Sequence, residues 1–346
     1  MKPLHFVLVR FSSLGDVVLQ TAVIRWLKAQ YGEQLKITFV TSVEFKDLVI
    51  GLPSVDRVLT FDRRAGAKLW GLVQELRKLH GEEPITLLLD LHATTRSFFL
   101  RLLLPEIPRL VVDKRRLERT LLVRLPVTKK WASWKIWGLE NQVERIARDW
   151  QGLLLAPFKK RADSLTSVPA VKPIEHPRPY VVFAPVASFA PKRWPMERFV
   201  ALARRFLSDE RWKDHDLVII AGPQDAHCEA LDAIGDPRLL NLQGKTKLKE
   251  SIAWLAGAKL VVGNDSGMNH IAEAQGVSVL TLFGPTHEKF GFAPHLKNSE
   301  ALSVDLWCRP CSATGKRACF RSEQFCFTEL TVEHVWQRLS HKLVGA

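Results

Sequence analysis

Short apolar runs and stretches of helical spacing alternate along almost the whole chain. The first run, residues 4–10, has the continuous apolarity of a buried strand, and residues 17–31 carry apolar positions at helical spacing. The pattern predicts strands over residues 4–10, 36–41, 55–61, 85–91, 109–112, 180–185, 216–221, 238–242, 259–263, 278–284 and 301–306. It predicts helices over residues 17–31, 43–52, 68–80, 95–104, 134–154, 195–207, 225–234, 248–258, 267–275 and 331–343. Strands that alternate with helices in this way form parallel sheets through right-handed crossovers, so we predict an α/β fold.

A proline-rich stretch divides this pattern in two. Residues 158–179 have no periodicity and contain four prolines, which is typical of a linker. A chain of 346 residues also exceeds the roughly 250–300 residues over which one core grows. We therefore expect a first domain over residues 1–165, a linker over 166–179, a second domain over 180–330 and a terminal helix within 331–346 that returns to the first domain. Two such domains would face each other across a cleft, with ligands beyond the carboxyl ends of the strands.

The composition is that of a globular protein, with 47% hydrophobic and 25% charged residues, and it argues against a disordered or fibrous chain. No stretch approaches the roughly 20 apolar residues of a membrane-spanning helix. The apolar run at the N-terminus is too short, and too soon followed by Arg10, to be a secretory signal. We therefore expect a cytoplasmic location.

The formal net charge of +14 indicates an anionic partner. Residues 101–130 hold nine Lys or Arg against three acids, and Trp131, Trp134 and Trp137 follow directly. Basic residues beside tryptophans suit contact with anionic headgroups at a membrane surface. A solvated helix face with tryptophans in the core explains the same pattern, and the sequence leaves both interpretations open.

The first candidate site, residues 12–16, joins the first strand to the first helix. Gly15 permits a tight turn, and Asp16 at a helix N-terminus stays ionised at neutral pH. Such a carboxylate can act as a general base, and it can equally serve only as a helix cap. The G-x-G-x-x-G pattern of dinucleotide-binding folds is absent here, which argues against a nicotinamide-dependent enzyme.

The second candidate site, residues 264–270, also joins a strand to a helix. Its sequence is Asn-Asp-Ser-Gly-Met-Asn-His, and the backbone amides of residues 266–268 would form a cradle for a diphosphate. Asp265 could accept hydrogen bonds from ligand hydroxyls, and His270 lies four residues after Ser266, on the same helix face. The alternative is a plain helix cap with His270 at the surface.

The third candidate site is the loop of residues 185–195, after the first strand of the second domain. Ser188 offers a hydroxyl, and Lys192 offers a positive charge that could stabilise a departing diphosphate. Lys192 and Arg193 could also be an ordinary basic pair at the surface.

Four of the five cysteines lie close together as Cys308-x2-Cys311-x7-Cys319-x6-Cys326. Four thiolates could hold zinc, but the second C-x-x-C of a typical zinc site is missing. Reduced structural thiols are the alternative in a cytoplasmic protein. We predict no metal here and assign the cysteines no part in catalysis.

Taken in order, these motifs resemble the ADP-heptose:lipopolysaccharide heptosyltransferase family, glycosyltransferase family nine. Residues 10–18, Arg-Phe-Ser-Ser-Leu-Gly-Asp-Val-Val, are similar to its opening motif, and Lys-Arg-Trp-Pro at 192–195 to its donor-domain loop. Residues 264–270, with Leu-Phe-Gly-Pro-Thr at 282–286, are similar to its nucleotide-sugar signature. Residues 19–22, Leu-Gln-Thr-Ala, depart from the His-Thr-Leu-Pro-like run that is common in the family.

The resemblance implies a GT-B fold of two Rossmann-like domains and an inverting transfer of heptose, with neither metal nor cofactor. The donor would be ADP-L-glycero-D-manno-heptose, and the acceptor would be lipid A–Kdo or a partial lipopolysaccharide core at the cytoplasmic face of the inner membrane, with no part for nucleic acid. Asp16 would be the general base. The acceptor contacts would be Ser13, Gly15 and Arg96, and the donor contacts would be Ser188, Lys192, Gln224, Asp265, Ser266, Gly267 and His270.

Two other functions stay open. The same fold could transfer a different nucleotide sugar or use a different acceptor. A non-catalytic basic protein that binds a membrane or nucleic acid would explain the charge, although it would leave the paired glycine–aspartate turns unexplained.

Overall fold

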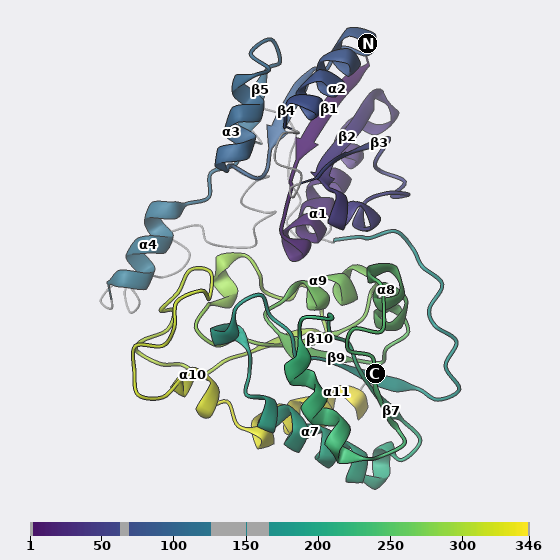
Figure 1. Ribbon diagram of the computed structural model, residues 1–346, viewed down its shortest axis with the longest axis vertical. Helices are drawn as coiled ribbons and strands as arrows, with labels where there is room; N and C mark the ends of the chain where they lie inside the picture. The colour runs from purple at the N-terminus through teal and green to yellow at the C-terminus, as the bar shows by residue number, and fades with distance from the viewer. Residues whose placement is uncertain (1–2, 63–68, 126–149, 151–165, 345–346) are drawn as a thin grey trace. The chain divides into compact units, whose positions relative to one another are not determined.

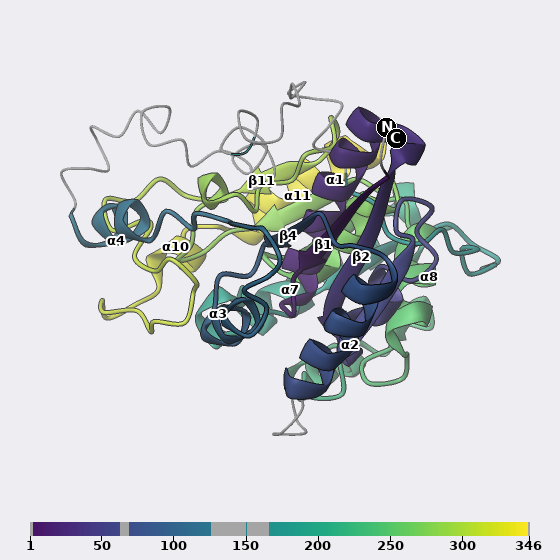
Figure 2. The same ribbon diagram turned by 90° about the horizontal axis from the view of Figure 1, so that it is seen from above.

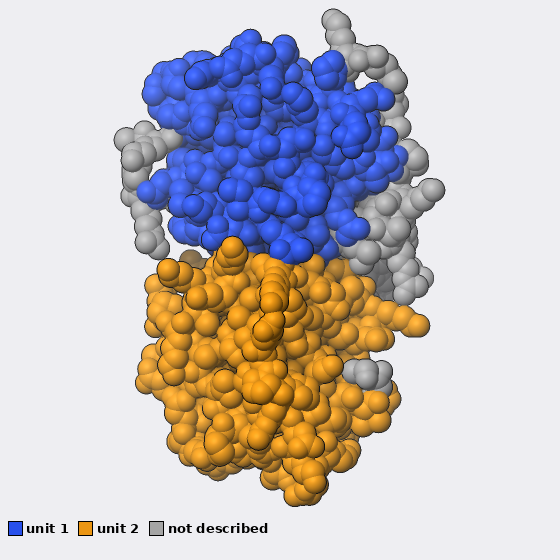
Figure 3. Space-filling model, turned by 90° about the vertical axis from the view of Figure 1, so that its right-hand side faces the viewer, with its two compact units in different colours: residues 1–116, 142–170 blue, residues 117–141, 171–346 orange. Residues whose placement is uncertain are grey.

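The computed structural model describes residues 3–62, 69–125, 150 and 166–344. The chain divides into two compact units, one of residues 1–116 and 142–170 and the other of residues 117–141 and 171–346 (Figure 3). One boundary, after residue 170, falls inside the predicted linker 166–179. The predicted helix over 134–154, Trp150 apart, and the three tryptophans 131, 134 and 137 lie outside the described residues.

The first unit is built on a five-stranded parallel sheet with the order β3-β2-β1-β4-β5. β1 is central, with Leu4 opposite Leu35 on one side and Phe6 opposite Leu87 on the other. The strands are β1 (Leu4–Val9), β2 (Leu35–Ser42), β3 (Arg57–Phe61), β4 (Leu87–Asp90) and β5 (Arg109–Val111). The helices are α1 (Leu14–Tyr31), α2 (Leu69–Glu82) and α3 (Thr95–Leu102).

Helices cover both faces of this sheet. Alternate residues of a strand point to opposite faces, and Val7 and Val9 pack in one cluster with residues of α2 and α3 such as Leu76 and Leu100. α1 lies on the other side of the sheet, as the view from above shows (Figure 2). Because both faces are covered, the central strands β1 and β4 are apolar at most positions, which is why the sequence shows runs there and no strict alternation.

The second unit is built on a six-stranded parallel sheet with the order β11-β10-β9-β6-β7-β8. Its strands are β6 (Tyr180–Ala184), β7 (Asp216–Ile219), β8 (Leu239–Asn241), β9 (Val261–Asn264), β10 (Val279–Leu282) and β11 (Glu300–Leu302). Its helices are α4 (Arg116–Arg124, all but the first residue), α7 (Met196–Ser208), α8 (Leu248–Ala256), α9 (Gly267–Ala274), α10 (Phe325–Thr328) and α11 (Val332–Val344). Both sheets therefore have the parallel, doubly wound topology that the sequence predicts.

The terminal helix α11 packs within the second unit. Val335, Trp336 and Leu339 are buried in one core with Phe199 and Phe206 of α7. Figure 1 shows α7 and α11 together on one side of the second sheet, with α8 and α9 on the other. The predicted return of this helix to the first domain is therefore corrected, since the second unit uses its apolar face.

Three further elements differ from the prediction. Residues 43–48 and 226–234 form 3-10 helices in place of α-helices. α4 was not predicted, because its sequence, Arg-Leu-Glu-Arg-Thr-Leu-Leu-Val-Arg, has few apolar positions and buries only Leu122 completely. Leu122 packs against Phe290, with Val123 and Phe292 beside them, and Arg119 donates a hydrogen bond to the carbonyl oxygen of Phe290 (2.9 Å).

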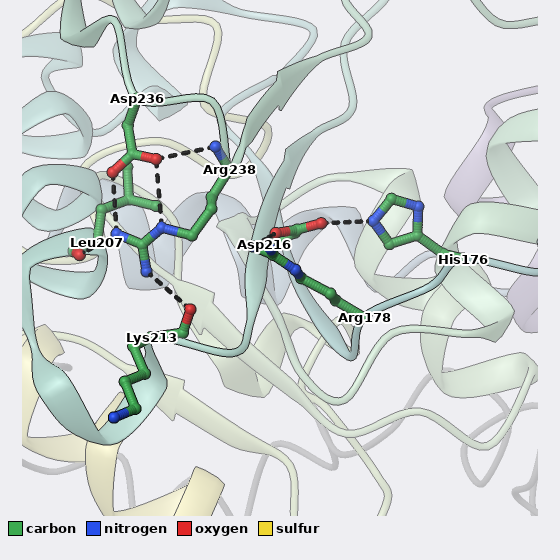
Figure 4. Close-up of polar contacts among 7 residues, drawn as sticks. All are labelled: His176, Arg178, Leu207, Lys213, Asp216, Asp236 and Arg238. Atoms are coloured by element: carbon green, nitrogen blue, oxygen red, sulfur yellow. Dashed lines mark hydrogen bonds and ion pairs between the residues drawn. The ribbon is translucent and has the colours of Figure 1, made fainter.

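Polar contacts hold the segment before β6 against the start of β7 (Figure 4). The buried carboxylate of Asp216 contacts His176 Nε2 at 2.7 Å and Arg178 Nη1 at 3.4 Å. A second pair, Arg238 with Asp236 (2.9 Å), lies just before β8. These contacts lie at the amino ends of the strands and leave the carboxyl ends to the loops that carry the predicted site residues.

No helix among the described residues is long and apolar enough to cross a membrane.

Candidate functional site

Asp16 lies in the first turn of α1, at the carboxyl end of the central strand β1. Its Oδ2 accepts hydrogen bonds from Ser13 Oγ (2.8 Å) and from the Ser13 backbone N–H (3.3 Å). Ser13 is the N-cap residue, so the two residues form a capping box. Asp16 therefore does take part in capping α1. These contacts use Oδ2, and the side chain of Asp16 is still 16% exposed, so the carboxylate can also meet a ligand.

Arg10 holds Asp16 in this position. The guanidinium is buried, with Nη2 2.6 Å from Asp16 Oδ2, and it donates to the carbonyl oxygens of Ser12 (2.7 Å) and Leu91 (2.6 Å). Burial alone would raise the pKa of Asp16, but the charge of Arg10 and the hydrogen bonds from Ser13 outweigh it and hold that pKa below its usual value. Asp16 is therefore ionised at neutral pH, as a base that accepts a proton must be.

Lys114 adds a second cation beside Asp16. It follows β5, and strands β1, β4 and β5 are neighbours in the sheet, so their loops meet at one edge. Burial first, and then the charges of Arg10 and Arg116, lower the pKa of Lys114 to about 8, although Asp16 and Asp90 act in the opposite direction. Lys114 makes no hydrogen bond or ion pair with any residue that the structure describes.

Sequence reasoning missed these roles of Arg10 and Lys114. Arg10 ended a predicted strand, and Lys114 was one basic residue among nine in residues 101–130. Each follows a strand of the same parallel sheet at its carboxyl end, β1 for Arg10 and β5 for Lys114, and this was the signal that could have singled them out.

The structure places two of the three predicted acceptor contacts beside Asp16 in sequence and the third on another helix. Ser13 and Gly15 lie in the Asp16 loop, and Gly15 is buried. Arg96 is exposed on α3, and within the described part of the chain no hydrogen bond or ion pair joins it to Asp16. From the same helix it is Arg101 that reaches the sheet edge, where its Nε lies 2.9 Å from the fully buried carboxylate of Asp90.

In the second unit, Lys192 and Asp265 lie together. Lys192 Nζ is 2.7 Å from Asp265 Oδ2, and the Thr286 hydroxyl donates to the same oxygen at 2.9 Å. The three residues come from the loops after β6, β9 and β10, which are neighbours at the carboxyl edge of the sheet. The sequence assigned Asp265 to ligand hydroxyls, and in the structure its Oδ2 also fixes the ammonium of Lys192.

The two loops that carry this pair are also joined by a hydrogen bond from a backbone N–H to a side chain. The buried side chain of Asn264 accepts a hydrogen bond from Trp194 N (2.9 Å), which ties the end of β9 to the loop after β6. Gly263 permits this close approach, because a Cβ there would lie 2.6 Å from Asn269 Oδ1 and 2.8 Å from the carbonyl oxygen of Ala184. The site is therefore built on closely packed strand ends.

α9 begins directly beside Asp265. Ser266 is its N-cap residue and Gly267 its first residue, so the first amides of the helix face the same sheet edge as Lys192. Such amides bind anions well. His270 is buried, with its ring 6.3 Å from that of Phe292, which rules out the alternative of a surface histidine.

The remaining predicted donor contacts are exposed. Ser188 lies in the loop after β6, and Gln224 lies in the loop after β7. The neighbour of Gln224, Asp225, accepts a hydrogen bond from Gly222 N (3.0 Å) and lies 3.4 Å from Arg193 Nη2. Asp225 is thus already held in place by the third candidate loop.

The cysteines are free thiols, with Cys308 and Cys326 buried. Burial raises the pKa of Cys326 to about 11, so this thiol is neutral at physiological pH. Among the described residues, no group of three or more His, Cys, Asp or Glu side chains is arranged to hold a metal ion.

Comparison with known proteins identifies the family. The family description "Glycosyltransferase family 9 (heptosyltransferase)" matches residues 111–319. The chain is 26% identical to lipopolysaccharide heptosyltransferase 2 of Salmonella typhimurium, over 81% of this chain and 82% of that one. It is also 26% identical to lipopolysaccharide heptosyltransferase 1 of Pseudomonas aeruginosa, over 99% of each chain.

Solved structures show the same fold. The E. coli ADP-heptose lps heptosyltransferase II superposes with a TM-score of 0.71 at 18% identity over 99% of both chains. The E. coli heptosyltransferase WaaC with ADP gives a TM-score of 0.69 at 18% identity, over 98% of this chain and all of that one. The predicted GT-B fold is confirmed by these neighbours, and the matched family covers more than half of the chain. The protein therefore belongs to glycosyltransferase family 9, the heptosyltransferase family, and is a glycosyltransferase.

Proposed function

We propose that this glycosyltransferase moves heptose from ADP-L-glycero-D-manno-heptose to the inner core of lipopolysaccharide. The observation that carries the proposal is the Lys192–Asp265–Thr286 group beside the first amides of α9, which offers a diphosphate an ordered ammonium and backbone amides. The heptosyltransferase names of the relatives and the ADP in the WaaC structure support the choice of donor.

On the donor side, the reaction leaves negative charge on the departing ADP. Lys192 and the amides of Ser266 and Gly267 would stabilise this charge without a metal ion, because they are donors fixed in place before the reaction begins. Ser188 would add a hydroxyl to the diphosphate and Gln224 would bind the ribose. Asp265 would hold the Lys192 ammonium and bind the sugar, with His270 beside it.

On the acceptor side, Asp16 would take the proton from the attacking hydroxyl. Its ionisation at neutral pH and its fixed position beside Arg10 suit this role. Direct attack by this hydroxyl on the side of the sugar opposite to ADP, with Asp16 as the base, would need no covalent intermediate and would invert the anomeric carbon. We therefore propose an inverting reaction.

We further propose that the first unit rests on the anionic cytoplasmic face of the inner membrane. Phe98, Phe99 and Leu102 of α3 are 51%, 47% and 57% exposed. Leu102 lies four residues after Phe98 and three after Phe99, so the helix places all three on one patch, with the exposed Arg96 and Arg109 nearby in the sequence. Apolar side chains flanked by arginines suit the headgroup region of an anionic bilayer. Co-sedimentation with vesicles that contain phosphatidylglycerol tests this proposal. We expect the protein to bind these vesicles and not neutral ones, and we expect the Phe98→Ser/Phe99→Ser variant to lose the binding. Equal binding by the variant and the wild type would contradict the proposal.

The transfer reaction is tested by incubating the protein with ADP-heptose and a heptose-free lipid A–Kdo acceptor, with and without EDTA. We expect transfer that is unaffected by EDTA and gives a product of inverted anomeric configuration. Transfer from another nucleotide sugar alone would replace heptose in the proposal while keeping the mechanism. Tight binding of RNA or vesicles without any release of ADP would overturn it. Elemental analysis of the purified protein for zinc and iron tests the metal-free interpretation of the four late cysteines.

A further inference from the structure

The segment of residues 305–328 carries the four late cysteines, and the reaction described so far gives it no part. It is nevertheless bonded to the loop after β10. The Arg309 guanidinium donates to the carbonyl oxygens of Gly284 (2.7 Å) and Thr286 (3.0 Å), and Cys311 N donates to that of Pro285 (3.1 Å). The segment therefore holds the backbone of the loop that positions Thr286, the hydrogen-bond donor to Asp265.

The same segment reaches the loop that carries Lys192. Gln324 Nε2 donates a hydrogen bond to the carbonyl oxygen of Pro191, the residue before Lys192, at 2.6 Å. Two of the loops that form the Lys192–Asp265–Thr286 group are thus fastened to one short stretch of chain.

Within this segment, Gly315 lies against the side chain of Lys192 itself. Its backbone has a φ of +77°, and a Cβ at this position would lie 2.2 Å from Cγ and 2.3 Å from Cδ of Lys192. The Ser312 hydroxyl accepts a hydrogen bond from Gly315 N at 2.8 Å and fixes this turn. The backbone at Gly315 therefore lies against the methylene chain of Lys192, and a Cβ at this position fits only if that side chain moves.

Lys192 is consequently held at both ends of its side chain. Asp265 holds the ammonium, and Gly315 covers the methylene groups, so that the side chain is only 16% exposed. A free lysine has many rotamers, and ordering it on ligand binding costs free energy; a lysine that is already ordered avoids this cost.

We propose that the cysteine-bearing segment forms one wall of the donor site, and that Gly315 is a positioning residue that keeps Lys192 directed at the diphosphate. The inference rests on the proposed role of Lys192 and deepens it. Since a displacement of about 1 Å can cost on the order of a hundredfold in rate, a methyl group at residue 315 that pushes Lys192 aside should lower kcat/KM for transfer about tenfold to a hundredfold. It should also weaken ADP binding.

The test compares Gly315→Ala with Gly276→Ala. Gly276 also has a positive φ, +84°, but nothing lies within 4 Å of a Cβ there, so this control has the backbone strain without the clash. Gly315→Ala should weaken ADP binding by calorimetry and lower kcat/KM, while Gly276→Ala should change neither. Ser312→Ala introduces no clash and only releases the turn, so it should lower ADP affinity and kcat/KM by less than Gly315→Ala does. It replaces Gly315→Ala in the test if that variant does not fold.

A double-mutant cycle separates positioning from general damage. In a Lys192→Ala background, Gly315→Ala should cause no further loss of ADP affinity, because the side chain that it displaces is gone. Losses that simply multiply would overturn the proposal, as would a Gly315→Ala protein that binds ADP like Gly276→Ala. The measurement of ADP binding needs no sugar or acceptor, so the inference can hold or fail even if the wild-type protein does not transfer heptose.

Discussion

Lys114, the second cation beside Asp16, leads to a stability prediction. A difference between the ordinary pKa of Lys114, 10.5, and its pKa of about 8 in the folded protein corresponds to about 3 kcal/mol. Solvent reaches part of this side chain and screens its charge, so we expect a smaller effect, about 1–2 kcal/mol. Lys114→Met should therefore raise the free energy of unfolding near pH 7 by about 1–2 kcal/mol.

The sign follows from proton binding. The folded protein holds the Lys114 proton less tightly than the unfolded chain does, so the charged lysine opposes folding at every pH below about 8. The penalty fades as the pH rises from about 8 to 10.5, where the lysine becomes neutral in both states. The gain from Lys114→Met should thus be full at pH 6–7 and small near pH 10.

Urea unfolding at these two pH values measures the effect, with Lys46→Met as the matched control. Lys46 is an exposed lysine of the same unit, and its replacement should change the free energy of unfolding by less than about 0.5 kcal/mol. A Lys114→Met protein that is no more stable than the wild type near neutral pH, or whose gain does not depend on pH, would refute the reasoning. We also expect the variant to use an anionic acceptor less well, since a cation kept at a cost to stability is typical of a ligand site.

Three further predictions concern the two sites and the fold. Asp16→Asn should lower kcat by about a hundredfold to ten-thousandfold, because the base is lost, and leave ADP affinity intact; near-normal turnover would remove Asp16 from the mechanism. Lys192→Ala should weaken ADP binding at least about tenfold in calorimetry, with Lys249→Ala, an exposed lysine of the same unit outside residues 305–328, unchanged. Asp216→Ala should lower the free energy of unfolding by about 1–3 kcal/mol, because His176 loses its partner, whereas unchanged stability would mean that the contacts of Asp216 in Figure 4 contribute nothing.

Much of the fold could be predicted because both sheets are covered on both faces. Runs such as Val181–Val182–Phe183 read as buried strands from composition alone, and the order of strands and helices then fixes the fold class. The 3-10 helices and the position of α11 could not be predicted in this way. Which sheet a helix such as α11 packs on depends on contacts between residues far apart in the sequence.

The candidate site was predictable only as far as it lies at the ends of strands. Asp16, Lys192 and Asp265 were found because each follows a strand, the place where open parallel sheets bind ligands. The partners that set their properties were not found. Gly315 is 123 positions after Lys192, and nothing in its local sequence indicates that its backbone touches that side chain.

The chain enters the second unit at α4, before the proline-rich stretch, and this has a practical consequence. α4 precedes the proline-rich stretch in sequence, yet Leu122 and Arg119 make their contacts with Phe290, in the second unit. A fragment that ends at residue 165 would keep this helix and lose the surface on which it packs, and the complementary fragment would expose Phe290. Anyone who wishes to express the two units separately, or to exchange the second unit between relatives, should carry residues 117–125 with the second unit and not cut only at the prolines.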